Sequence, residues 1–155
     1  MKALIVLTLL LIGSWSAVAQ LRDLPRNYWD NLEDFTMKNK FDPETQNFTR
    51  LPKFGNKLIR LDGKKIYLQG YIIPADLTKG RMTLSKFSYS SCYFCGAAGP
   101  ETVIEIVAPN PIIYRMDKPI ILEGILRINR TTEEREYDPF RLLYILEEAT
   151  YYSGK

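Results

Sequence analysis

Two cysteines separated by two residues are the clearest chemical signal in this chain. Cys92 and Cys95 lie in the stretch SSCYFCGAAGPE and are the only cysteines among the 155 residues. Thiols at this spacing can ligate a soft metal ion, act as a redox pair or close a small disulfide. The spacing alone favours the disulfide, because a zinc ribbon normally shows two such pairs.

The composition limits what can complete a metal site or carry out catalysis. The chain contains no histidine, which removes the usual general base and the commonest metal ligand. A closed zinc site has four ligands, so carboxylates, water or the cysteines of a second copy must supply the rest, whereas copper(I) accepts two thiolates. Glu101 is the nearest carboxylate and Glu105 is the next. If the thiols hold a zinc or copper ion, the predicted metal-site residues are Cys92, Cys95 and Glu101, with Glu101 either as a further ligand or as the residue that fixes the loop. No enzymatic activity is predicted, and thiol–disulfide chemistry is left open.

The residues that follow the cysteines predict a tight, exposed loop rather than a helix. Gly96 and Gly99 tolerate positive φ, and the two alanines between them let backbone segments approach closely. Catalytic dithiols of the thioredoxin type instead lie at a helix N-terminus, where the helix dipole stabilises the thiolate. The loop context therefore argues against catalytic dithiol exchange.

The segments on either side of the loop carry the alternating pattern of β-strands. In KIYLQGYIIP, Ile66, Leu68 and Ile72 share one face, which indicates a half-buried strand. Gly70 and Gly124 each lie in the middle of such a pattern and predict a bulge or a sharp bend. The predicted strands are residues 65–74, 81–90, 101–109, 118–130 and 141–152.

Five strands with bent members predict a mainly β fold, a small five-stranded OB-like barrel over residues 54–152. The cysteine loop then connects its second and third strands. Within the same domain, NKLIRLDGKK predicts a short helical turn that buries Leu58 and Leu61 and ends at Gly63.

Residues 20–53 are predicted to form an N-terminal extension that packs on the barrel. Trp29 and Leu32 are the large apolar side chains expected to anchor it. The other expected elements are a short strand near residues 34–40, with Phe35 and Met37 facing inward, and a turn-rich segment over residues 42–53.

The first nineteen residues have the three parts of a secretory signal peptide. Lys2 supplies a positive charge, residues 3–12 form an apolar run, and Ala-Val-Ala at 17–19 matches a cleavage site. The apolar run is shorter than the roughly 20 residues that a spanning helix needs. We therefore predict cleavage after Ala19 and a periplasmic or secreted protein without a stable membrane anchor.

The charge of the chain is nearly balanced. It has 21 basic and 18 acidic residues, a net charge of +3 at pH 7. OB-like barrels often bind oligonucleotides, but so small an excess argues against a phosphate-backbone partner. We therefore expect no nucleic-acid ligand, and the length indicates a single domain.

Two segments of the chain resemble a known family. LDGKKIYLQGYIIP followed by SSCYFCGAAGPETVIEI resembles an uncharacterised bacterial envelope family, catalogued as domain of unknown function 3299, in its subgroup with the pattern CxxCGxxGPE. The resemblance covers roughly residues 29–149. The matching positions are Gly70, Tyr71 and Pro74 in the first segment and Cys92, Cys95, Gly96, Gly99, Pro100 and Glu101 in the second.

The resemblance implies an accessory role in metal handling beside envelope transport components, and it shifts the interpretation of Cys92 and Cys95 from a disulfide to a metal site. The expected function is then a secreted, non-enzymatic binding module that holds zinc or copper and has an envelope protein as partner. Two alternatives remain open: a redox or structural disulfide, and a protein-interaction module anchored by Tyr93 and Phe94. The oligomeric state is also open, and a metal shared between chains would make the protein a dimer.

Overall fold

The computed structural model describes residues 26–43, 46–76, 81–134 and 136–153. The predicted signal peptide, residues 1–19, lies outside the described residues. Within those described ranges, no helix is long and apolar enough to cross a membrane.

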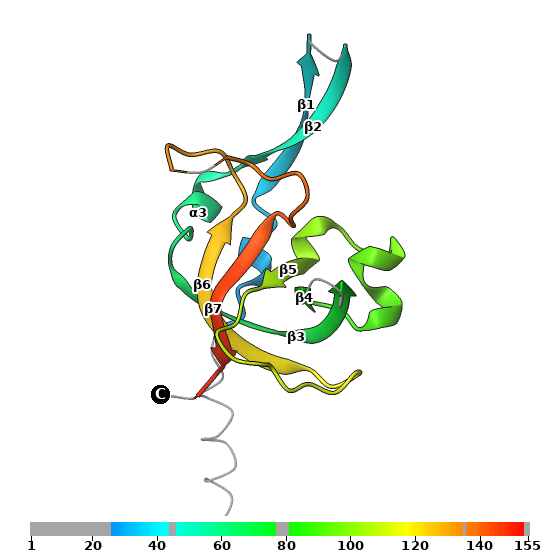
Figure 1. The fold of residues 1–155 in the computed structure, drawn as a ribbon, viewed down its shortest axis with the longest axis vertical. Helices are drawn as coiled ribbons and strands as arrows, with labels where there is room; N and C mark the ends of the chain where they lie inside the picture. Colours follow the sequence, from blue (N-terminus) through cyan, green and yellow to red (C-terminus); the bar gives the residue numbers. More distant parts are fainter. Residues whose placement is uncertain (1–25, 44–45, 77–80, 135, 154–155) are drawn as a thin grey trace, which may run out of the picture.

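Five strands close into a barrel in the order β3-β4-β5-β7-β6, with β3 pairing to both β4 and β6 (Figure 1). Neighbouring strands are antiparallel except β5 and β7, which run parallel. The mainly β, OB-like barrel predicted from the sequence is therefore confirmed, and each predicted strand corresponds to one barrel strand. The bounds are β3 Lys65–Asp76, β4 Arg81–Ser85, β5 Val103–Ile106, β6 Ile120–Ile128 and β7 Tyr144–Tyr151.

Two glycines that were predicted to mark a bulge or a sharp bend allow neighbouring strands to approach closely. A Cβ atom on Gly70 would stand 2.3 Å from the carbonyl oxygen of Ser85, and one on Gly124 would stand 2.6 Å from that of Glu147. Residues up to Gly70 pair with β6, and the residues after it pair with β4. The β6–β7 register shifts across Gly124. Each glycine thus lies where a strand must change partner or register without a side chain in the way.

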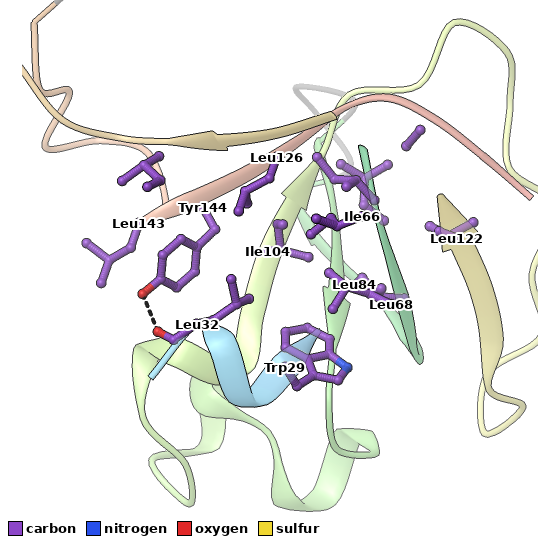
Figure 2. Packing of buried hydrophobic residues seen from close by; sticks show 14 of the residues in the cluster. Trp29, Leu32, Ile66, Leu68, Leu84, Ile104, Leu122, Leu126, Leu143 and Tyr144 are labelled. Atoms are coloured by element: carbon purple, nitrogen blue, oxygen red, sulfur yellow. Dashed lines mark hydrogen bonds between the residues drawn. The ribbon is translucent and has the colours of Figure 1, made fainter. Parts of the chain in front are cut away.

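The barrel interior is filled by aliphatic side chains from all five strands (Figure 2). The 3-10 turn η1, Trp29–Asn31, adds Trp29, and Leu32 follows it; both predicted anchors are buried. The indole Nε1 of Trp29 donates to the carbonyl oxygen of Gln69 at 2.7 Å. The hydroxyl of Tyr144 in β7 donates to the carbonyl oxygen of Leu32 at 2.6 Å. These two bonds satisfy the polar atoms that the anchors would otherwise bury without partners.

The segment before the barrel differs from its prediction. Residues 42–53 were expected to be turn-rich, but β2, Asn47–Phe54, pairs antiparallel with β1, Phe35–Asp42, along its whole length. Pro52 is compatible with this pairing because each strand of a two-stranded sheet has a solvent-facing edge. The hairpin projects from the barrel (Figure 1), so Met37, expected to face inward, is exposed while Phe35 packs against the core.

A short helix joins the hairpin to the barrel, as predicted. The helix α3, Asn56–Ile59, buries Leu58, and Gly63 beyond it has a φ of 79°. The carboxylate of Asp34 accepts the backbone N–H groups of Lys57 at 2.9 Å and Leu58 at 3.3 Å. A residue at the base of the hairpin thereby caps the helix start and ties the two elements together.

The bond between Tyr144 and Leu32 gives a first test of this packing. We expect Tyr144→Phe to lower the free energy of unfolding by about 1–2 kcal/mol, because the buried carbonyl of Leu32 loses its only protein donor described here. The free energy of unfolding is measured by urea unfolding, and the comparison is valid if the variants share one m-value. Tyr151→Phe is the matched control: its hydroxyl also donates to a carbonyl, but the ring is exposed, so the change should stay within about 0.5 kcal/mol. Equal effects of the two variants would contradict this account.

Candidate functional site at the cysteine loop

The cysteines lie in the connection between β4 and β5, which folds into three 3-10 turns. These turns are η3 Tyr89–Ser91, η4 Tyr93–Cys95 and η5 Pro100–Thr102. The backbone N–H of Lys86 donates to the carbonyl of Thr102 at 2.9 Å and closes the base of the loop.

The middle turn ends as the sequence predicted. Gly96 has a φ of 74°, and its N–H donates to the carbonyl of Tyr93 at 2.9 Å. A left-handed residue at this point stops the turn after one cycle, which glycine does without strain. Cys92 therefore precedes a single 3-10 turn and not an α-helix, so no helix dipole acts on its thiol.

The two thiols are adjacent but differ in exposure. The Sγ atoms of Cys92 and Cys95 are 3.8 Å apart, and both cysteines are free. The thiol of Cys95 also donates to the carbonyl oxygen of Tyr89 at 3.2 Å. Cys95 is exposed, whereas Cys92 is completely buried. The expectation of an exposed loop is thus wrong for Cys92, because this residue lies at the junction of η3 and η4 and its side chain is covered there.

The surroundings of Cys95 oppose an activated thiolate. Its hydrogen bond with Cys92 raises the pKa of Cys95, and partial desolvation and the charge of the neighbouring sulfur act in the same direction. Catalytic cysteines need a lowered pKa, because the thiolate is the nucleophile. The electrostatics of the metal-free pair therefore argue against catalytic dithiol exchange.

The two candidate carboxylates are held elsewhere. The carboxylate of Glu101 folds back over Gly99, where a Cβ atom would lie 2.3 Å from its oxygens. Burial raises the pKa of Tyr144, and the charge of Glu101 adds to that effect. Glu105 is buried on β5 and accepts Nε and Nη2 of Arg141 at 3.0 and 2.8 Å.

The structure therefore brings Cys92 and Cys95 together without a third ligand of the usual kinds. In the part of the chain that the structure describes, no group of three or more histidine, cysteine, aspartate or glutamate side chains could hold a metal ion. The role of Glu101 as a ligand stays a prediction. No sequence pattern indicated that Glu105 forms an ion pair with Arg141, because Arg141 lies 36 positions further along the chain.

Aromatic side chains surround the thiols at the surface. Tyr93 and Phe94, predicted as an exposed tip, are 36% and 48% exposed, and their rings meet edge to face with centroids 5.5 Å apart. Tyr89, which the sequence analysis did not single out, is 58% exposed. The thirteen residues from Ser88 to Pro100 include no charged side chain. The site is thus a thiol pair beside exposed aromatic rings, and the carboxylate of Glu101 lies over Gly99 in the same loop.

A polar hollow of about 740 Å³ lies between α3, β6 and β7, away from the cysteines. Four of the charges that line it form two ion pairs, Arg127 with Glu147 at 2.8 Å and Arg130 with Asp62 at 3.2 Å. Glu133 and Glu134 line the same hollow.

Comparison of the chain with protein-family models, with curated proteins and with solved structures finds no match. The likeness to the bacterial envelope family therefore stays a prediction based on the residues named above.

The unequal exposure of the thiols predicts unequal reactivity. Under native, reducing conditions a maleimide should modify Cys95 first and Cys92 at least about tenfold more slowly, because a buried thiol reacts only when the structure opens locally. The measurement is a time course by mass spectrometry. Cys95→Ser should remove the fast phase, and Cys92→Ser should keep it. Equal rates in the native protein would show that Cys92 is not buried.

Proposed function

We propose that this protein is a non-enzymatic binding module that holds a soft metal ion, zinc or copper(I), between Cys92 and Cys95. The observation that carries the proposal is the 3.8 Å separation of two free Sγ atoms. Two thiolates bound at about 2.3 Å to one tetrahedral ion lie about 3.8 Å apart. Disulfide-bonded sulfurs would be only about 2.05 Å apart. The separation, which is also that of a hydrogen bond between two thiols, supports the proposal because it matches two corners of a tetrahedral thiolate site.

The location and partner of the module rest on the sequence. The signal-peptide pattern at residues 1–19 and the resemblance to an envelope family support a periplasmic or secreted protein that is accessory to a metal-transport system. The exposure of Cys95 is compatible with such a role, because an exchanging ion needs one ligand that solvent or a partner can reach.

A second candidate function is protein interaction through the aromatic tip. The specific observation is that Tyr93 and Phe94 project exposed rings, and aromatic side chains are enriched at interaction hot spots. Mutations distinguish the interaction module from the metal-binding module. An interaction module would lose its partner on Tyr93→Ser with Phe94→Ser and keep it when both cysteines are serine.

Metal binding by the thiols gives the main test. The exported protein, purified without chelator in mild reductant, should bind zinc tightly enough to be seen in a native mass spectrum. Cys92→Ser or Cys95→Ser should weaken zinc binding by more than the roughly 10–100-fold that is lost when a residue hydrogen-bonded to a metal ligand is replaced. Ser90→Ala, an exposed change in the same loop, is the matched control and should leave binding unchanged. Absence of any metal adduct, or a mass two daltons low despite the reductant, would reject the proposal.

The pH dependence supplies an independent check. Each thiol must lose its proton to bind the ion, and the pKa of Cys95 is raised in the metal-free protein. The apparent zinc affinity should therefore fall as the pH falls, by about tenfold per participating thiol for each pH unit below the thiol pKa. An affinity independent of pH between neutral and mildly alkaline conditions would show that the thiols are not the ligands.

A further inference from the structure

We infer that the metal site is completed by a second copy of this chain, so that one tetrahedral zinc ion is held by Cys92 and Cys95 of both copies. This inference rests on the proposed function and names the partner of the same site. Four thiolates in a tetrahedron are a characteristic zinc environment.

The first argument is the number of ligands. A closed zinc site needs four, and the whole chain has two cysteines and no histidine. Of the nearby carboxylates, Glu105 is engaged by two nitrogens of Arg141, and Glu101 lies over Gly99. A second copy supplies the two missing thiolates at the spacing the first copy already has, 3.8 Å.

The second argument is the position of the thiols. Cys92 is buried and Cys95 is exposed beside it. A second molecule can therefore reach an ion on the side of Cys95, and the side chains that cover Cys92 must move aside for its thiol to bind an ion shared with a second copy.

The third argument is the surface around the thiols. A twofold contact brings the same patch of both copies together, so a charge in the patch would face its own copy. The residues from Ser88 to Pro100 include no charged side chain, and the carboxylate of Glu101, which lies over Gly99, is the charge that a self-contact must keep apart from its own copy. Tyr89, Tyr93 and Phe94 offer exposed aromatic area, which is enriched in the buried centre of interfaces. The aromatic rim thus fits a second copy of itself.

The test is a titration of the exported, reduced protein with zinc, followed by native mass spectrometry and light scattering. The expected species is a dimer with one zinc ion per two chains, which a chelator returns to metal-free monomer. Ser90→Ala should keep this complex, and Cys95→Ser should abolish it.

Two further variants test the interface apart from the ligands. Phe94→Ser should raise the dissociation constant of the zinc-bound dimer at least about tenfold. Phe48→Ser is the matched control, because that ring is 70% exposed at the end of the hairpin β1–β2 and should have no effect.

The remaining outcomes separate the two proposals. A monomer with one zinc ion per chain would overturn the shared site and leave the metal-binding function standing. No zinc binding at all would overturn both. A dimer that persists with chelator and in the cysteine variants would also overturn the shared site, since the metal would not hold it together.

Discussion

Closure of the barrel depends on two places where one strand passes against the backbone of its neighbour. At Gly70 and Gly124 a single additional carbon atom would collide with a carbonyl oxygen of the adjacent strand. β3 pairs with β6 up to Gly70 and with β4 beyond it. The ends of β4 and β5, and therefore the base of the cysteine loop, are fixed by that closure. Two residues without a side chain, Gly70 and Gly124, therefore help to fix the position of the cysteine loop.

The cysteine loop combines a rigid base with little regular structure of its own. Strand pairing fixes both ends, the bond between Lys86 and Thr102 closes the base, and three short turns set the sulfur atoms. The result is an arrangement in which one thiol belongs to the packed interior and the other to the surface. Packing covers the thiol of Cys92, whereas solvent reaches the thiol of Cys95.

The sequence predicted the barrel because its strands have two differing faces. Alternation along residues 65–74 and 118–130, with a glycine in each, identified β3 and β6 and their bends. The strand β2 was not predicted, because its two faces do not differ clearly in burial. Most of the projecting hairpin is exposed, so Asn47–Phe54 shows no alternation that distinguishes a strand from a loop. A proline within the segment strengthened the wrong assignment.

The candidate site was predictable in its residues and not in its environment. The spacing of Cys92 and Cys95 indicated that the sulfurs meet, and they lie 3.8 Å apart. The burial of Cys92 depends on tertiary packing, which no local sequence pattern indicates. The ion pair of Glu105 depends on Arg141, which lies far along the chain. The absence of histidine was the more informative sequence feature, because it limits the ligands wherever the chain folds.

The position of β7 has a consequence for the order of folding. This last strand lies between β5 and β6 and makes the only parallel pairing among the described barrel strands. Until Tyr144–Tyr151 is available, β5 and β6 each lack a neighbour, and the interior lacks Tyr144 and Leu146. The barrel therefore closes only once residues 144–151 are available, through contacts between segments distant in sequence, which fold slowly.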